Sequence, residues 1–314
     1  MPPLPLFRLP GLVLFEVFKS LSIGEKINLS LCSKKISTQI NNARLCSQKV
    51  IVNLDMLDHG MRVRTENNRD TFDIFISLYS RRRNDPDMQQ CQIDGHTVPL
   101  FSFTREIDTF WKNYQEGFLS IIRHLSKMFQ CKILISGSCH CSDIFQPIIS
   151  ELFNLQLEFE TLIIRPNGSK DENLLWNQIS NKFGLVEDLN ILSIVDPGFK
   201  PVFSSWPQKI SITSSAWFTL ESLLVCPCSF INLEDSHLKT NDLDVILKKW
   251  KAGGFPNLER RAINGQDITN NETTILGMSL WELSGMNCTR SRLGLEKNHL
   301  KDTFGGYNTK AATS

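Results

Sequence analysis

The segment "FRLPGLVLFEVFKSLSIGEKINLSLCSKK" (residues 7–35) contains two helix starts and almost no polar side chains in its first half. Proline at position 10 suits the first turn of a helix, where its missing N–H has no intrahelical partner to lose. The side chains that recur with the spacing of one helix face are Leu14, Val17, Phe18 and Leu21. Further apolar side chains lie off this face, at Leu12, Val13 and Phe15. We therefore expect a helix that is covered on more than one side, by this chain or by a partner.

A second helix start follows at Ser22, because Ser22 and Glu25 have the spacing of a capping box. The predicted helix carries Ile27 and Leu31 on one face, and "CSKK" (residues 32–35) interrupts it. A third short helix is predicted around Ile36 and Ile40. Three short helices within about 40 residues form a unit that is too small to be stable alone.

These residues together resemble an F-box. The matching elements are the Leu9-Pro10 pair, the apolar spacing of Val13, Val17 and Leu21, and the helix end at Leu29, Ser33 and Lys34. The resemblance implies an F-box over residues 1–45 that docks on the Skp-type adaptor, and through it on a cullin, in a cullin–RING ubiquitin ligase. The residues it implies for adaptor binding are Leu9, Pro10, Val13, Leu14, Val17, Leu21, Leu29 and Ser33. The alternative is an ordinary helical hairpin that packs on its own domain.

The composition narrows the functional class. The formal net charge is +1, from 34 basic and 33 acidic side chains, which argues against a nucleic-acid-binding protein. The chain shows no secretion signal and no apolar run long enough to span a bilayer, so we expect no membrane attachment. Nine cysteines without framework spacing suit a reducing compartment. We therefore predict an intracellular protein, cytoplasmic and/or nuclear.

From residue 116 onward, helical and strand patterns alternate. We mark each predicted strand by its second inward-facing residue. Successive strands are then separated by 18 to 30 residues, and the marked residues are Ile135, Ile164, Ile194, Ile212, Leu233 and Ile263. Steps of this length predict a degenerate strand–helix repeat, similar to the leucine-rich-repeat class of solenoids. The alternative is an irregular α/β domain with a mixed sheet. Residues 46–115 are predicted to form a connecting α/β segment that begins with a strand at 50–55, and residues 116–314 the repeat region.

The segment from residue 217 to 263 resembles the type-2 F-box-associated domain of nematode-type F-box proteins. The matching positions are Trp217, residues 219–224, Ile231, Leu233, residues 242–243, 247–250, 253–254 and 256–259. The resemblance places an F-box-associated domain at about residues 200–265. From the residues alone, Leu243, Leu247 and Trp250 share one helix face and are expected in the core, and Gly253 is expected to end that helix.

Catalytic and metal-binding motifs are not evident in the sequence. "CHC" (residues 139–141) and "CPC" (residues 226–228) have one intervening residue, whereas structural zinc sites use two to four. The chain has no phosphate-binding loop, dinucleotide fingerprint, zinc-protease motif or nucleophile elbow. We therefore predict no catalytic residue, no metal site and no cofactor.

These observations favour a non-catalytic substrate-recognition subunit of an SCF-type ubiquitin ligase. Its F-box is predicted to bind the Skp-type adaptor, and its carboxy-terminal α/β region a target protein. The identity of the target and the residues that contact it are not encoded in any recognisable pattern. The alternative is a repeat-type interaction scaffold that acts outside a ubiquitin ligase, and an intracellular hydrolase is a more distant one.

Overall fold

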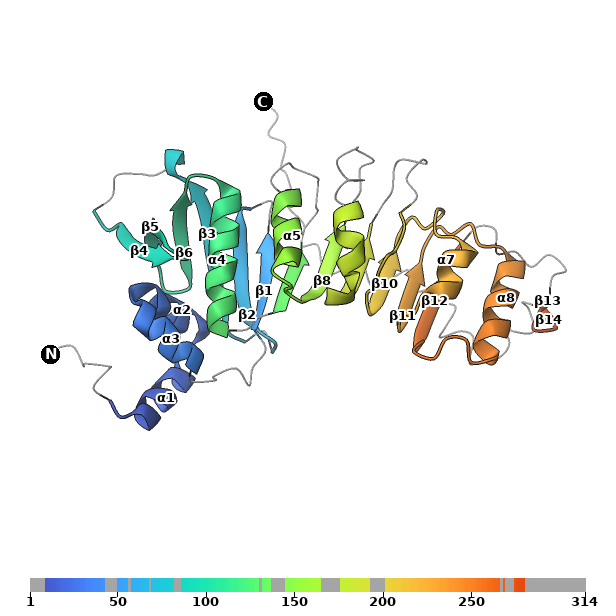
Figure 1. The fold of residues 1–314 in the computed structure, drawn as a ribbon, viewed down its shortest axis with the longest axis horizontal. Coiled ribbons are helices and arrows are strands. Elements are labelled where there is room, and N and C mark those ends of the chain that lie inside the picture. Colours follow the sequence, from blue (N-terminus) through green and yellow to red (C-terminus); the bar gives the residue numbers. More distant parts are fainter. Residues whose placement is uncertain are drawn as a thin grey trace, which may run out of the picture.

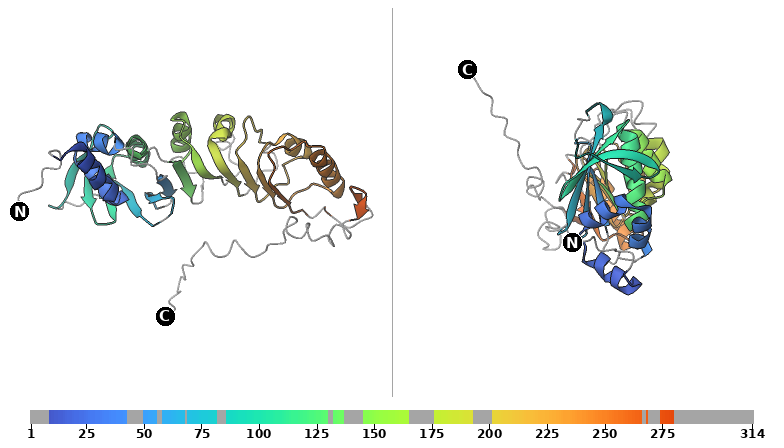
Figure 2. Two further views of the ribbon diagram at one scale, coloured as in Figure 1. Left: turned by 90° about the horizontal axis from the view of Figure 1, so that it is seen from below. Right: turned by 90° about the vertical axis from the view of Figure 1, so that its left-hand side faces the viewer.

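A computed structural model describes residues 9–42, 50–55, 58–67, 69–81, 86–129, 132–136, 145–164, 176–192, 201–265, 268 and 274–279. Within these residues the chain forms an elongated α/β molecule, with a long sheet covered by helices on one face (Figures 1 and 2). Three amino-terminal helices pack at one end of this sheet, and the last strands lie at the other end.

The amino-terminal part consists of three short helices followed by strands. The helices are α1 (Gly11–Ser20), α2 (Ile23–Cys32) and α3 (Lys34–Asn42). The strands are β1 (Val50–Asp55), β2 (Gly60–Thr65), β3 (Thr71–Leu78), β4 (Gln89–Ile93), β5 (His96–Ser102) and β6 (Glu106–Trp111), with a 3-10 turn η2 (Tyr79–Arg81) after β3. β1, β2 and β3 pair antiparallel, β6 joins β3 in parallel, and the β4–β5 hairpin forms the outer edge.

The rest of the chain alternates between helices and strands. In chain order these are α4 (Tyr114–Phe129), β7 (Lys132–Ser136), α5 (Phe145–Asn154), β8 (Phe159–Ile164), η3 (Ser180–Leu185), β9 (Val186–Ile191), β10 (Lys209–Ile212), α7 (Leu220–Val225), β11 (Phe230–Leu233), α8 (Thr240–Lys251) and β12 (Arg260–Ile263). Each strand pairs in parallel with the next one, and β7 pairs in parallel with β1. Both parts of the chain therefore share one sheet.

The described strands follow the order β12-β11-β10-β9-β8-β7-β1-β2-β3-β6-β5-β4 in this sheet. A short hairpin of β13 (Thr274–Ile275) and β14 (Met278–Ser279) packs separately against α8. Because side chains alternate along a strand, each strand has one face toward the helices and one away from them. Three side chains of neighbouring strands lie in register and are buried beneath the helices: Leu189, Ile210 and Ile231. In register on the opposite face are Asn190, Ser211 and Asn232.

The predicted fold class, α/β with an amino-terminal three-helix unit, is confirmed. The strands predicted around residues 135, 164, 212, 233 and 263 correspond to β7, β8, β10, β11 and β12, whereas Ile194 lies outside the described residues. The leucine-rich-repeat-like regularity is not confirmed: α5 precedes β8, whereas the helical residues 176–179 run directly into the 3-10 turn η3 before β9. The sheet is parallel from β12 to β1, and its mixed part runs from β1 to β4.

The end of helix α8 departs from its sequence prediction. Leu243 is buried and Leu247 is half-buried, as expected, but Trp250 is 46 % exposed, so its predicted place in the core is wrong. The physical reason is that β12 is the last strand of the described sheet, and α8 ends at Lys251 close to that edge.

None of the helices in the described part of the chain has the length and apolar character needed to cross a bilayer.

Candidate adaptor-binding surface

Helix α1 begins directly after Pro10, whose backbone is extended. Pro10 has φ −56° and ψ 145°, and its carbonyl oxygen accepts the first helical hydrogen bond from the Leu14 N–H at 3.0 Å. Leu14 and Phe18 are buried on the inner face of α1. On the outer face, Leu12 is 82 % exposed and Val13 is 46 % exposed. The helix is therefore apolar on both sides, and the described residues cover only one of them.

The eight residues predicted for adaptor binding fall into three groups in the structure. Exposed are Pro10 and Val13. Half-buried are Leu9, Val17, Leu21, Leu29 and Ser33. Leu14 alone is buried, at 8 % exposure, and it packs in the core of this chain. Leu12 was not predicted, although its position off the inward stripe was a signal in the sequence that it faces outward.

Helix α2 has the capping box that the sequence predicts. The Glu25 N–H donates to Ser22 Oγ at 3.2 Å, and the Ser22 N–H donates to Glu25 Oε2 at 2.8 Å. The hydrogen bonds from the backbone and side chain of Ser22 lower the pKa of the Glu25 carboxyl, because they favour its charged form. The capping box therefore marks the start of α2 by local chemistry.

The same helix end is also tied to the sheet. The Ile23 N–H donates to Asp70 Oδ2 at 2.6 Å, across 47 residues of sequence. Gly24 lies directly on the Phe72 ring of β3, and a Cβ atom at this position would overlap that ring. Glycine here permits a close approach that no other residue type allows. The helices and the sheet therefore share one hydrophobic core.

A second polar contact joins α2 to α4. Ser30 Oγ lies 2.8 Å from His124 Nε2 and also donates to the Ile27 carbonyl oxygen at 2.7 Å. Burial, and to a smaller extent the charge of Lys127, lowers the pKa of His124. A neutral imidazole is therefore favoured at this junction. The residues around it line a groove between the α2–α3 helices and the β4–β5 hairpin.

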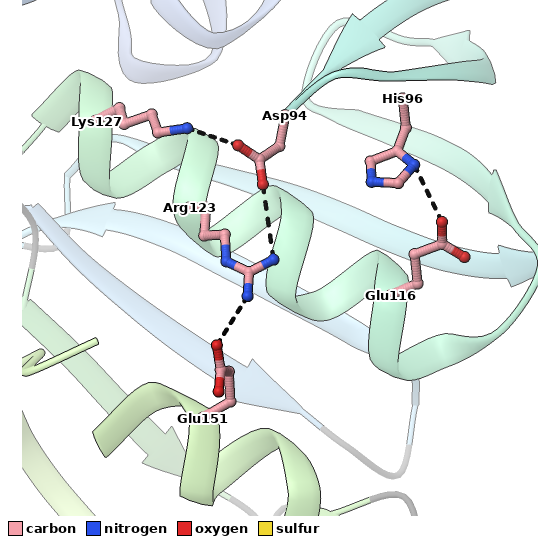
Figure 3. A network of polar contacts seen from close by, with 6 residues as sticks. All are labelled: Asp94, His96, Glu116, Arg123, Lys127 and Glu151. Carbon is pink, nitrogen blue, oxygen red and sulfur yellow. Dashed lines mark hydrogen bonds and ion pairs between the residues drawn. The ribbon is translucent and has the colours of Figure 1, made fainter. Parts of the chain in front are cut away.

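An ion-pair network holds the β4–β5 hairpin against the helices that follow it (Figure 3). Asp94, in the hairpin turn, contacts Lys127 at 2.6 Å and Arg123 at 3.8 Å, both on α4. Arg123 in turn contacts Glu151 of α5 at 2.9 Å. The Asp94 carboxylate is only 14 % exposed, so solvent screens these contacts less than those of a surface pair. Because the hairpin lies against α2, the network also supports the position of the amino-terminal helices.

The structure describes only one of the two cysteine motifs. "CHC" (residues 139–141) lies outside the described residues. Cys226 and Cys228 are both buried, and the Cys228 thiol donates to the Pro207 carbonyl oxygen at 3.1 Å. No group of three or more metal-ligating side chains comes together within the described part of the chain.

Two protein-family models match separate parts of this chain. The F-box domain model matches residues 6–48, and a model described as F-box associated matches residues 199–263. The chain contains an F-box and an F-box-associated domain. The F-box comprises α1, α2 and α3, and the F-box-associated domain comprises the sheet from β10 to β12 with α7 and α8.

Comparison with curated proteins and with solved structures gives no match. F-box and F-box-associated domains are typical of adaptor proteins rather than of enzymes.

Proposed function

We propose that this chain is a substrate-recognition subunit of an SCF-type cullin–RING ubiquitin ligase. Residues 1–45 bind a Skp-type adaptor, and through it a cullin, and the carboxy-terminal α/β region binds a target protein. Transfer of ubiquitin is carried out by other subunits, so this chain needs no catalytic residue. The protein acts in the cytoplasm, the nucleus or both.

The observation that carries this proposal is the exposed outer face of α1. Single exposed apolar side chains are normal on protein surfaces, but Leu12 and Val13 are adjacent and lie within an F-box match. They sit on a helix whose other face is packed, so they are presented without any rearrangement of the fold. Proline at position 10 and the half-buried Leu9 stand beside them at the start of the helix, and we include both in the adaptor-binding surface.

The shape of the molecule supports two simultaneous contacts. The F-box packs at one end of the long sheet, and β12 with α8 forms the other end (Figure 1). A continuous hydrogen-bonded sheet between them fixes their separation. Adaptor and target can therefore bind at the same time, as recruitment requires.

The test measures binding of a purified Skp-type adaptor to the full chain. Val13→Asp places a charge on the exposed face of α1, and loss of an interface anchor typically costs about 2 kcal/mol or more. This corresponds to roughly a thirtyfold or greater loss of adaptor affinity. Val202→Asp is the matched control, since Val202 is 71 % exposed but lies in the F-box-associated region. It is expected to bind the adaptor as the unchanged protein does.

Unchanged adaptor binding by a folded Val13→Asp protein would overturn the proposal. The same result would favour the alternative, a scaffold that binds its partner outside a ubiquitin ligase. Circular dichroism melting curves of both variants confirm that any loss of binding is not caused by unfolding.

A further inference from the structure

The described helices pack on one face of the sheet, and strands β3 and β6 show which side chains point the other way. Phe72 of β3 packs on α2, and Trp111 of β6 packs on α4. Phe75 and Asp108 each lie three residues from one of these aromatic residues on the same strand. Because side chains alternate along a strand, Phe75 and Asp108 face away from the helices. We name this side of the sheet the open face.

Three side chains of the open face form one row across neighbouring strands (Figure 1). Phe75 of β3 is the register partner of Asp108 of β6, and Asp108 is the register partner of Phe101 of β5. Register partners lie on the same side of a sheet, so the three side chains belong to one surface. Phe75 is 37 % exposed, and the other two are half-buried. We name Phe75, Asp108 and Phe101 the Asp108 site.

The two aromatic rings of the Asp108 site are held by neighbours on the open face. The Phe75 ring lies against Gly60 of β2, 3.4 Å from the point where a Cβ atom would stand. The Phe101 ring meets the buried Phe110 ring edge to face, with centroids 5.8 Å apart. Neighbouring strands are about 4.8 Å apart, so Phe75 and Phe101 flank Asp108 with about 10 Å between their backbones. A flat cation in contact with both rings needs about 7 Å.

The carboxylate at the centre of the site lacks a cationic partner. Oδ1 of Asp108 is buried and accepts no hydrogen bond from the described residues. Burial raises the pKa of the Asp108 carboxyl, a hydrogen bond from Ser77 opposes this shift, and the charge of Glu106 adds to it. A buried acceptor without a donor is costly, and a ligand that brings a donor removes this cost.

The next row of the open face shows how a carboxylate is satisfied on this surface. Asp73 of β3 accepts hydrogen bonds from Nε and Nη2 of Arg62 at 2.7 and 3.1 Å. The register partner of Asp73 on β6 is Glu106, two residues before Asp108. Within the described part of the chain, neither Glu106 nor Asp108 makes an ion pair. The open face therefore presents two uncompensated carboxylates beside two aromatic rings, which favours a cation.

We propose that the Asp108 site binds an arginine side chain of a partner protein. The guanidinium donates two parallel N–H groups to the Asp108 carboxylate and stacks against the Phe75 and Phe101 rings. Asp108 is half-buried, so rotation about its own side-chain bonds is enough to present both oxygens. The three residues lie outside the F-box and F-box-associated matches, so this proposal goes beyond the proposed function and does not depend on it.

The chemistry of the site distinguishes arginine from other cations. Oδ1 of Asp108 needs an N–H donor, which a trimethylated ammonium group does not have. A lysine ammonium donates but is compact and strongly hydrated, whereas a guanidinium is planar, stacks on aromatic rings and matches the geometry of a carboxylate. A calcium or magnesium ion would need several oxygen ligands, and no group of three metal-ligating side chains comes together within the described residues.

The first experiment selects peptides for this site from a phage-displayed library of random dodecapeptides. The library is first depleted on the Asp108→Asn protein, which removes peptides that bind elsewhere, and is then selected on the immobilised full chain. We expect the remaining peptides to share an arginine. A remaining pool that shares lysine or an acidic residue instead, or no pool above background, would overturn the proposal.

The second experiment titrates a synthetic copy of the most enriched peptide into the full chain. Replacement of its arginine by citrulline keeps the planar shape but removes the charge. We expect this change to lower the affinity at least about tenfold, which corresponds to about 1.4 kcal/mol. Higher salt should weaken binding of the arginine peptide more than binding of the citrulline peptide. Equal affinities of the two peptides would contradict a charged ligand.

Variants of the chain localise the contact to the two rings. Phe75→Leu and Phe101→Leu keep an apolar side chain but remove the ring, and each should lower the affinity about two- to fivefold. Asp188→Asn and Phe230→Leu are the matched controls, because both residues are half-buried and flank Lys209 in another row of the open face. The controls should bind the peptide as the unchanged chain does. Equal losses in the ring variants and the controls would place the peptide elsewhere.

Thermal melting separates a binding role of Asp108 from a structural one. Asp108→Asn removes a partly buried charge that has no cationic partner in the described chain, so the variant should melt at the same temperature as the unchanged chain or higher. A carboxylate needed for the fold would give the opposite result. A lower melting temperature of Asp108→Asn would show that Asp108 is satisfied within the folded chain and would overturn the proposal.

Discussion

Ser30 of α2 and His124 of α4 lie 2.8 Å apart, and this contact joins the F-box to the helix that covers the central sheet. Because the Ser30 hydroxyl donates to the Ile27 carbonyl oxygen, His124 Nε2 is the donor to Ser30 Oγ. Burial of His124 lowers its pKa from the ordinary value of 6.5. The groups that face it from neighbouring positions are Lys127, which lowers the pKa further, and Asp94, which raises it. The junction between the two modules is therefore sensitive to acid.

The lowered pKa of His124 predicts how the free energy of unfolding depends on pH. Well above pH 6.5 His124 is neutral in both states and makes no pH-dependent contribution. As the pH falls below 6.5, the unfolded chain takes up a proton that the folded chain resists, so the free energy of unfolding falls. Urea unfolding at pH 7.5 and pH 5.5 measures the difference. His124→Gln should reduce it, at a cost of about 1 kcal/mol at pH 7.5 for the altered hydrogen bond.

His59 provides the internal control for that measurement. Its pKa is also lowered by burial, so it contributes the same sign of pH dependence in both proteins. The difference in the pH dependence of stability between the unchanged chain and His124→Gln therefore reports on the junction. An identical pH dependence in the two proteins would mean that His124 takes up its proton freely in the folded state.

The packing of α2 on the sheet predicts a steric effect. Gly24→Ala would place a methyl group on the Phe72 ring and is expected to destabilise the chain by about 1–3 kcal/mol. Gly11→Ala is the control, because no atom lies within 4 Å of the added Cβ. Chemical denaturation compares them. Phe72→Leu should relieve part of the penalty of Gly24→Ala, and strictly additive effects would contradict the contact.

The ion pairs of Asp94 should matter more than an exposed pair. Asp94→Asn keeps a residue that tolerates the left-handed backbone at this turn (φ 48°) but removes the charge that Lys127 and Arg123 share. We expect a loss of about 1–2 kcal/mol. Glu16→Gln removes the charge of the exposed Glu16–Lys19 pair and should change stability by less than about 0.5 kcal/mol. Similar losses in both variants would show that burial of Asp94 adds nothing.

The two faces of α1 should separate stability from adaptor binding. Leu14→Ala leaves a cavity in the core and is expected to cost about 2–5 kcal/mol of unfolding free energy. Leu12→Ala, at the exposed face, should change stability by no more than about 0.5 kcal/mol but weaken adaptor binding. Thermal melts and adaptor titrations of the two proteins provide both readouts. A large stability loss in Leu12→Ala would show that this face is covered within the chain.

The local features of this protein follow from the amino-acid sequence. The capping box of Ser22 and Glu25, the end of α8 at Gly253, and the positions of most strands after residue 130 all follow from short-range chemistry. The F-box and the F-box-associated domain were recognisable for the same reason, because their signatures are runs of neighbouring residues.

The way in which these elements meet depends on contacts between residues far apart in the sequence. The pairing of β1 with β7 makes one sheet of two sequence regions, and the contact of Ile23 with Asp70 spans 47 residues. Neither has a signal in the local pattern, because any apolar strand can pair with several others. Trp250 shares a helix face with two core residues, yet it is exposed because the sheet ends at β12. Periodicity shows which face of a helix is apolar, but only the arrangement of the neighbouring elements determines how far that face is covered.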